Sequence, residues 1–257
     1  MTDFGGKERI DQNDQLYKLI REGQPLGSYF GYKTDGLFQS YDEIANSALP
    51  VGASVQPGDV KYVDVNHDGV IDAKDKVDLG NGLPKYTFGF NINLGYKGFD
   101  LSLNATGAAG FQIAQSYRDP NSSQSNYSRQ ILNRWTGEGT SNRIPRVTYG
   151  DVGNWQFSDL YLQDGDYIRL QNITLGYDFK RLISWKGLSK LRLYVQAQNL
   201  FTLTKYDGMD PEIGSYNGTD GNKQNSDGTT NQTWVSGVDM GYYPHPRTFI
   251  VGINLAF

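Results

Sequence analysis

The last twelve residues of the chain, 246–257, alternate between two kinds of side chain. Every second position is large and apolar, and the positions between are mostly small or polar. A period of two is that of a β-strand with one apolar face. Soluble domains usually end in a polar, frayed tail, whereas this strand ends on an aromatic residue, so we expect it to be buried, with lipid as a candidate. The apolar set is Phe249, Val251, Ile253, Leu255 and Phe257.

The same strand pattern occurs earlier in the chain. The segment PKYTFGFNINLGY at 84–96 aligns with PRTFIVGINLAF at the terminus, apolar position for apolar position. After a two-residue turn at Lys97-Gly98, residues 99–105 alternate in the same way, which predicts a β-hairpin. Segments 167–179 and 191–199 alternate too. Strands of this length match the roughly 9 to 11 residues that cross a bilayer as a tilted β-strand.

The connections between these strands differ in length. The connections at 97–98 and 180–190 are short, whereas 108–166 and 206–246 are long and polar. If the C-terminus is periplasmic, every long connection falls on the extracellular side, as in bacterial outer-membrane barrels. The sequence therefore predicts an all-β protein, the antiparallel portion of a transmembrane β-barrel with long extracellular loops. We expect about six or seven strands.

The first part of the chain is less regular. Residues 1–23 fit either a strand or one helical turn, 27–38 is aromatic and predicts a strand, and 41–48 is helical or irregular. The first twenty residues contain no apolar stretch of the kind found in a signal peptide. No run approaches the roughly 20 apolar residues of a transmembrane helix.

Composition excludes some classes of function. A net charge of -4 and a sequence pI near 5.2 argue against a nucleic-acid partner. The chain has no cysteine, so disulfides and thiolate metal sites are excluded. Its two histidines lie in no metalloprotease or nucleophile motif, and Asp164-Gly165-Asp166 fits a turn better than a catalytic carboxylate pair. We therefore expect no enzyme and no catalytic residues.

The segment 59–80 contains a calcium-like loop. Calcium loops of the EF-hand type place oxygen ligands at positions 1, 3, 5, 7, 9 and 12, with glycine at position 6. Gly69 holds position 6, but position 12 is Asp instead of the usual Glu, and no helix pair flanks the loop. The alternative is an Asx-rich turn that binds nothing. The predicted ligands of this structural calcium are Asp64, Asn66, Asp68, Val70, Asp72 and Asp75.

Tryptophans in the long connections are the candidate substrate contacts. Trp135, Trp155 and Trp234 fall in the predicted extracellular loops. Indole rings stack on sugars, but in barrels they also form interfacial girdles or pack within loops. Both interpretations remain open for these three residues.

The order of several motifs along the chain closely resembles the C-terminal portion of SusC/RagA-type TonB-linked outer-membrane transporters of the Bacteroidota. The motifs are GSYFGYKTDGLF, PGDVKYVDVNHDGVIDAKDKVDLGNGLPKYTFGFNINLGYKGFDLSL, LNRWTGEGTSNRIPRVTYGD, SDLYLQDGDYIRLQNITLGYDF, LRLYVQAQNLFTLTKYDGMDPEI and GYYPHPRTFIVGINLAF. The resemblance implies a plugged barrel of about 22 strands that imports glycan oligomers or peptides. It further implies energy from TonB in the periplasm and a SusD-like surface lipoprotein as a lid. The terminal strand ending in Phe257 resembles the signal read by the barrel-assembly machinery.

A family member of full size would also carry a signal peptide, a plug with the TonB box and many more strands. We therefore expect this chain to be a fragment, a truncated reading frame or one part of a split transporter. Alone it would expose lipid-facing strands and two unpaired sheet edges. The alternative hypothesis is a soluble, calcium-stabilised β-sandwich that binds carbohydrate, suggested by the calcium-like loop and the aromatic residues.

Overall fold

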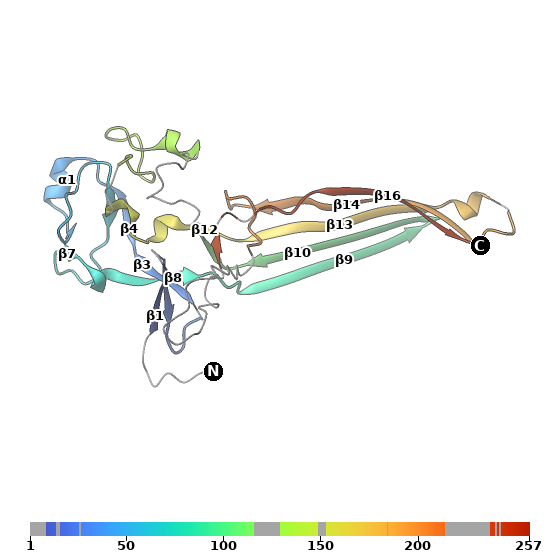
Figure 1. The fold of residues 1–257 in the computed structure, drawn as a ribbon, viewed down its shortest axis with the longest axis horizontal. Helices are drawn as coiled ribbons and strands as arrows, with labels where there is room; N and C mark the ends of the chain where they lie inside the picture. Colours follow the sequence, from blue (N-terminus) through green and yellow to red (C-terminus); the bar gives the residue numbers. More distant parts are fainter. Residues whose placement is uncertain are drawn as a thin grey trace, which may run out of the picture. The chain divides into compact units, whose positions relative to one another are not determined.

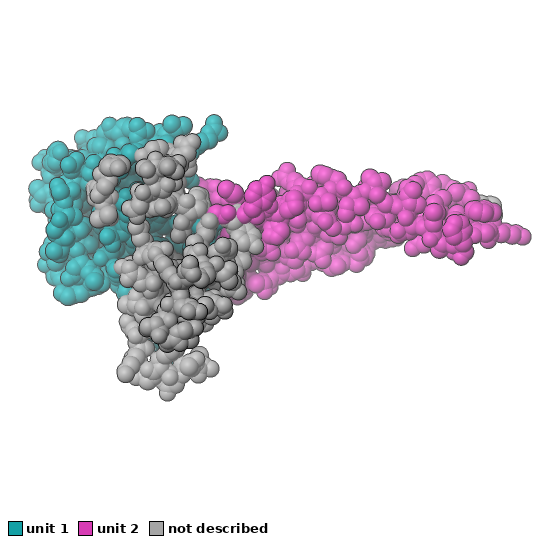
Figure 2. Space-filling view, viewed as in Figure 1, with its two compact units in different colours: residues 1–83, 112–163, 214–240 teal, residues 84–111, 164–213, 241–257 magenta. Residues whose placement is uncertain are grey.

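The computed structural model describes residues 9–13, 16–25, 27–115, 129–148, 153–183, 185–213, 237–239, 241 and 243–257. The chain divides into two compact units, coloured separately in Figure 2. Unit 1 comprises residues 1–83, 112–163 and 214–240, and unit 2 comprises 84–111, 164–213 and 241–257. Each unit is therefore assembled from three separate stretches of sequence. Within the ranges given above, no helix is long and apolar enough to cross a membrane.

Unit 2 is one antiparallel sheet of five strands that pair in chain order (Figure 1). Its C-terminal end lies beside the second short connection, since the Ser189 N–H donates to the Ala256 carbonyl at 2.7 Å. The short connections thus lie at one end of the sheet and the long connections begin and end at the other, as the sequence predicted. The strands are β9 (Tyr86–Tyr96), β10 (Phe99–Ala109), β13 (Tyr167–Asp178), β14 (Lys190–Thr204) and β16 (Thr248–Ala256).

Local chemistry explains both short connections. Lys97 and Gly98 have φ values of 44° and 94°, which is the backbone of a type I′ turn and matches the twist of a two-residue hairpin. The other connection begins with a 3₁₀ turn, η5 (Phe179–Leu182), and the Asp178 side chain caps it by accepting the Lys180 N–H at 3.0 Å. The predicted hairpin is confirmed.

The register places the apolar positions of all five strands in continuous rows. Residues opposite one another in paired strands point to the same face of a sheet. One such row crosses the whole sheet, and its members at both edges are exposed, with Leu94 at 59% and Val251 at 77%. The predicted apolar face is therefore present, and it is exposed at both edges of the sheet. The row is Leu94, Leu101, Leu175, Val195 and Val251.

A bulge lengthens β14 beyond its predicted end. The alternation breaks at Asn199, where the sequence analysis ended the strand, but the strand continues to Thr204. Asn199 adopts a φ of 50°, a conformation that asparagine tolerates, and its side chain donates to the Pro246 carbonyl at 3.2 Å. The extra residues return Phe201 to the apolar face, opposite Leu170.

The sheet of unit 2 has five strands, fewer than the six or seven expected. The difference arises at 27–38, which divides into β3 (Ser28–Tyr32) and β4 (Thr34–Leu37) in two other sheets. Tyr29 and Tyr32 are both buried in unit 1, so alternation of exposed and apolar faces does not apply there.

Unit 1 is built from short strands and turns. A four-stranded sheet joins β1 (Arg9–Asn13), β2 (Leu16–Ile20), β3 and β8 (Lys76–Asn81). β4 pairs with β6 (Val60–Tyr62), and β5 (Leu49–Pro50) pairs with β7 (Val70–Ile71). A third group contains β11 (Gln112–Gln115), β12 (Leu162–Asp164) and β15 (Val238–Asp239). The single turns are α1 (Tyr41–Ala45), η1 (Ala73–Asp75), η2 (Arg129–Asn133), η3 (Gly153–Trp155) and η4 (Asp159–Tyr161).

The core of unit 1 draws on all three of its stretches. Tyr29 is fully buried, and its hydroxyl donates to the carbonyl of Gly237 at 2.6 Å, across 208 positions of sequence. Gly31 lies so close to the next stretch that a Cβ there would be 2.5 Å from the Phe157 carbonyl oxygen. Residues from the chain before β9 and from both long connections thus pack in one core. The core cluster around Tyr29 contains Ala114, Phe157, Leu162 and Val238.

Candidate functional site

The polar face of the sheet in unit 2 carries mostly uncharged hydrogen-bonding groups. Two adjacent rows run across it, and they consist of amides and hydroxyls except for Ile250 at one edge. Neutral amides donate and accept hydrogen bonds without a charge that would reject one class of ligand. The rows are Asn91, Asn104, Asn172, Gln198 and Thr248, followed by Asn93, Ser102, Thr174, Gln196 and Ile250.

Some of these groups have partners and others do not. The Asn93 amide donates to Asn91 Oδ1 at 2.7 Å on β9. By contrast, Asn104 Oδ1 and Thr106 Oγ1 are buried side-chain oxygens with no hydrogen-bond partner among the described residues.

Glycines on the polar face make room for a cross-strand ion pair. The Arg192 guanidinium passes over Gly176, and its Nε lies 2.8 Å from Oδ1 of Asp100, two strands away. A Cβ at Gly176 would lie 2.5 Å from both groups. The same guanidinium lies 4.8 Å from the ring of Tyr194, which in turn lies over Gly252. In this pair the two opposite charges on the polar face neutralise each other.

A second charged cluster lies at the long-connection end. Arg169 on β13 is only 3% exposed and donates to the buried carboxylate of Asp210. Arg169 also pairs with Glu212 at 2.9 Å and donates to the Thr202 hydroxyl at 3.0 Å. His245 Nδ1 lies 3.1 Å from Asp210 Oδ2. Because Asp210 and His245 lie at opposite ends of the second long connection, the cluster fixes both ends to the sheet.

The electrostatics of Asp210 follow from these contacts. Burial alone would raise the pKa of its carboxyl group, but hydrogen bonds from the Glu212 N–H, from His245 and from Arg169 outweigh burial and lower it. Asp210 is therefore ionised and balances the buried guanidinium. The sequence analysis did not identify this cluster, since its members share no motif.

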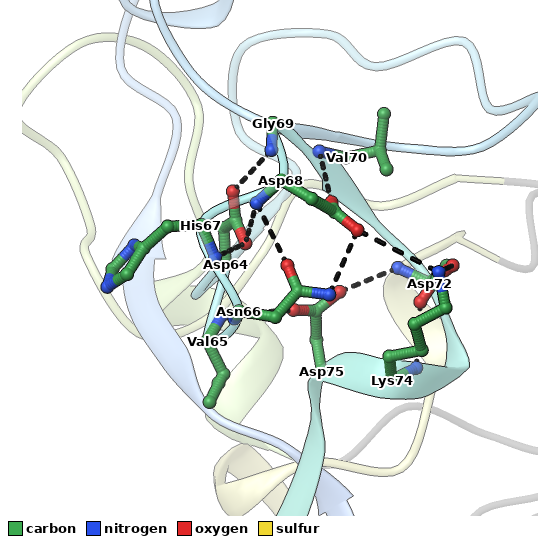
Figure 3. A network of polar contacts seen from close by, with 10 residues as sticks. All are labelled: Asp64, Val65, Asn66, His67, Asp68, Gly69, Val70, Asp72, Lys74 and Asp75. Carbon is green, nitrogen blue, oxygen red and sulfur yellow. Dashed lines mark hydrogen bonds and ion pairs between the residues drawn. The ribbon is translucent and has the colours of Figure 1, made fainter.

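The calcium-like loop of unit 1 is held by carboxylate-to-backbone hydrogen bonds (Figure 3). Asp64 accepts the N–H groups of His67 at 2.7 Å and Gly69 at 2.8 Å. Asp68 Oδ1 accepts the Val70 N–H at 3.1 Å. The ammonium group of Lys74 lies 3.6 Å from Asp72 and 3.9 Å from Asp68.

Asp75, the last predicted ligand, joins the two ends of the loop through hydrogen bonds. It is fully buried and accepts the N–H groups of Val65 at 2.9 Å and Asp72 at 2.8 Å. Burial alone would raise the pKa of the Asp75 carboxyl group. The hydrogen bonds from the backbone N–H groups of Asp72, Val65 and Asn66 together outweigh burial and lower this pKa below its ordinary value.

The donor chemistry of the loop fits a hard cation, since its side chains offer carboxylate and amide oxygens. In the part of the chain that the structure describes, however, no three histidine, cysteine, aspartate or glutamate side chains come together closely enough to hold a metal ion. The six predicted ligands lie on one loop, but the side-chain oxygens of five of them already accept backbone N–H groups: Asp64, Asn66, Asp68, Asp72 and Asp75. Calcium binding by this loop stays a prediction.

The structure describes two of the three predicted substrate-contacting tryptophans. Trp135 is half-buried, its indole N–H donates to Gln39 Oε1 at 3.1 Å, and a Cβ at Gly58 would lie 2.4 Å from its ring. Trp155 lies in η3 and is also half-buried. Trp234 lies outside the described residues. Trp135 therefore packs unit 1 together, and stacking of either described indole on a ligand stays a prediction.

The two aspartates considered as a carboxylate pair form a turn. Asp164 Oδ1 accepts the Asp166 N–H at 3.0 Å, and Asp166 Oδ1 accepts the Gly110 N–H at 2.6 Å. The Asx-turn interpretation is confirmed.

The predicted assembly signal lies on an edge strand. β16 pairs with β14 and is the last strand in the order of the sheet. Its apolar side chains are exposed: Phe249 72%, Val251 77%, Ile253 60%, Leu255 56%, and Phe257, just beyond the strand, 82%.

Comparisons with known proteins agree with this architecture. No protein-family model matches the chain. TonB-dependent receptor P3 of Formosa agariphila is 33% identical over 93% of this chain, and TonB-dependent receptor SusC of Bacteroides thetaiotaomicron is 28% identical over 95%. The chain spans 23% and 21% of the length of these relatives.

Solved structures show the same fold. The RagAB peptide transporter matches 99% of this chain with a TM-score of 0.70 and 20% identity, over 25% of its own chain. The RagAB peptide importer in the open-open state matches 100% of this chain with a TM-score of 0.68 and 20% identity, again over 25% of its own chain.

The fold thus defines the class: unit 2 is an antiparallel sheet with the fold of a part of a β-barrel wall. The relatives define the family more narrowly. Over almost its whole length the chain is similar to TonB-dependent receptors, SusC among them, and its fold is that of a part of RagAB.

Proposed function

We propose that this chain forms barrel wall and outer loops of a TonB-dependent importer that takes up large polar nutrients across the outer membrane. The observation that carries the proposal is the two-sided sheet of unit 2. Its apolar rows are exposed at mid-strand, and its other face presents neutral amides and hydroxyls. A sheet with these two faces suits a boundary between lipid and an aqueous lumen.

The substrate class follows from the polar face. Glycan oligomers and peptides both present many neutral hydroxyl, amide and carbonyl groups, and the amide rows can hydrogen-bond to either. The name of the RagAB peptide importer supports peptides as one possibility. Transport involves no covalent chemistry, and the relatives' names describe receptors and importers, so we propose no catalytic residue.

Orientation and partners complete the proposal. With the short connections and the C-terminus in the periplasm, the long connections that make up much of unit 1 are extracellular. There unit 1 would meet a SusD-like surface lipoprotein that covers the entrance. TonB would act on such an importer through its plug domain. The exposed edge of β16 and its aromatic end would engage the barrel-assembly machinery.

The soluble β-sandwich is the weaker explanation. A sandwich buries the apolar faces of its sheets against each other. Here the large side chains on the apolar face of the two edge strands are exposed, from 37% for Phe88 to 77% for Val251. Carbohydrate binding by such a module is therefore not our proposal.

A pair of arginine substitutions on neighbouring residues tests the membrane assignment. Ile92→Arg places a charge near the middle of β9 on the apolar face, whereas Asn91→Arg places it near the middle of the same strand on the polar face. An arginine facing lipid near the bilayer midplane costs about 2–4 kcal/mol. We expect Ile92→Arg to reduce recovery of the chain in floated lipid vesicles by at least tenfold, with little effect of Asn91→Arg. Equal behaviour of the two variants would contradict a lipid-facing role.

We also propose that the loop at 64–75 takes up calcium as a structural ion. The support is its set of oxygen ligands in the predicted spacing, with Asp68 partly exposed. The ion would compete with Lys74, whose ammonium group now lies near Asp68 and Asp72.

A further inference from the structure

The short-connection end of unit 2 differs in charge from the long-connection end. Residues 96–100 and 177–192 contain six basic side chains and two acidic ones, a formal excess of four positive charges. At the other end, residues 84–86, 164–169, 205–213 and 243–247 contain four basic and five acidic side chains. The sheet therefore carries its positive charge at one end. The basic residues there are Lys97, Lys180, Arg181, Lys186, Lys190 and Arg192.

The two acidic side chains at this end are already engaged. Asp100 pairs with Arg192 on the polar face, with 2.8 Å between Oδ1 and Nε. Asp178 accepts the N–H groups of Lys180 at 3.0 Å and Leu191 at 3.4 Å. Neither carboxylate forms an ion pair with Lys97 or Lys186 in the part of the chain that the structure describes. The positive charge of these two exposed lysines is thus available to an external anion.

Aromatic side chains form a belt beside these lysines. The ring centres of Phe99 and Tyr177 lie 4.5 Å apart, and those of Tyr177 and Phe179 lie 4.9 Å apart. Trp185 and Phe257 meet edge to face at 6.3 Å and are 61% and 82% exposed. Aromatic rings at one end of an apolar transmembrane face occupy the level of the lipid head groups.

The lysines are positioned at the level of this belt. The ammonium group of Lys97 lies 5.2 Å from the ring of Tyr96, which ends β9 and is 70% exposed. Lys186 directly follows Trp185. The ammonium group of Lys180 donates to the carbonyl of Trp185 at 2.6 Å and so holds the second short connection in shape.

We infer that this basic and aromatic belt binds the phosphate head groups of anionic phospholipids. The inference rests on the proposed function, because it requires unit 2 to span a membrane with its short connections in the periplasmic leaflet. Cationic side chains beside an interfacial aromatic belt attract phosphate head groups, and the aromatic rings fix their depth. The belt therefore selects the lipid neighbours of this part of the barrel wall.

Native mass spectrometry of the whole chain, extracted from vesicles that contain equal phosphatidylglycerol and phosphatidylcholine, tests the inference. We expect the wild-type chain to retain phosphatidylglycerol in preference to phosphatidylcholine. Each basic residue near a membrane surface contributes about fivefold to this preference. The double variant Lys97→Gln/Lys186→Gln should therefore lower it about twenty-five-fold. High salt should lower it as well.

The matched control is Lys33→Gln/Lys205→Gln, which removes the same charge at exposed positions that do not belong to the belt. Equal loss of preference in both double variants would overturn the inference in favour of a general charge effect. Insertion of the wild-type chain without any preference for phosphatidylglycerol would overturn the inference alone. Failure to insert into either lipid would overturn the proposed function and the inference together.

Discussion

The acidic side chains of the loop at 64–75 accept hydrogen bonds from its backbone. Each carboxylate there accepts N–H groups, and Asp75 accepts those of Val65, Asn66 and Asp72 in a buried position. The lowered pKa of Asp75 means that its ionised form stabilises the loop above the ordinary pKa of an aspartate. That stabilisation is lost as pH falls through the folded-state pKa.

Calcium binding can be separated from this structural role at Asp68. Asp68→Asn keeps an oxygen for the Val70 N–H but removes a charged ligand. We expect calorimetry on the whole chain to show calcium binding at millimolar ion or below, weakened about tenfold or more by Asp68→Asn. Asp78→Asn is the control, since Asp78 caps the Gly80 N–H in the same way outside the loop. No heat from the wild-type chain would leave the segment as a turn only.

Arg169 and Asp210 show what residue-level analysis of the sequence missed. They lie 41 positions apart, and His245 lies a further 35 away from Asp210. No motif announces such a cluster, because its members meet only when the sheet is formed. The one available signal was an arginine within an alternating strand, which requires a partner when it is buried.

In strands β9 and β10 the alternation of side chains and the residues of the turn together predict the hairpin. The type I′ turn at Lys97-Gly98 sets the register, and the register sets both faces. In β14 the same logic ended the predicted strand too early, since the bulge at Asn199 interrupts the alternation and then restores it. A local pattern cannot distinguish a bulge from a strand end without the partner strand.

Glycines in the strands are predicted to differ sharply in their tolerance of substitution. A Cβ at Gly107 would lie 2.5 Å from the Tyr167 carbonyl oxygen, a backbone atom, and 2.5 Å from the Phe88 ring. We expect Gly107→Ala to destabilise the folded chain by about 1–3 kcal/mol through overpacking. At Gly95 the nearest contact of a Cβ would be 3.9 Å, so Gly95→Ala should change stability by less than about 1 kcal/mol. Urea denaturation in lipid vesicles measures both, and equal losses would refute the packing argument.

The whole molecule contains a body that no single segment defines. Three stretches of sequence meet in the core of unit 1, and the Tyr29 side chain contacts two of them, the carbonyls of Gln112 and Gly237. Burial raises the pKa of the Tyr29 hydroxyl well above its usual value, so it stays a neutral donor at any physiological pH. The described residues of the long connections that reach this core, such as 112–115 and 237–239, are therefore held by packing with the rest of unit 1.

Removal of the Tyr29 side chain should loosen all three stretches at once. Loss of a buried aromatic ring costs about 3–5 kcal/mol. We expect Tyr29→Ala to increase hydrogen exchange in 28–32, 112–115 and 237–239 together, while the strands of unit 2 keep their protection. Tyr41→Ala, at a position that is 69% exposed, is the control. Loosening confined to 28–32 would show that the three stretches are not one cooperative body.

The sequence by itself determined the sheet of unit 2, its two faces and the ends at which its connections lie. These follow from period-two alternation and turn residues, which act over a few positions, and the strand ending in Phe257 carries them most clearly. Only the tertiary structure decided that 27–38 divides between two sheets and that the long connections share a core. It also decided that Arg169 meets Asp210 and His245. Such contacts join residues as far as 208 positions apart, and their partners are chosen by packing in three dimensions, to which local periodicity does not respond.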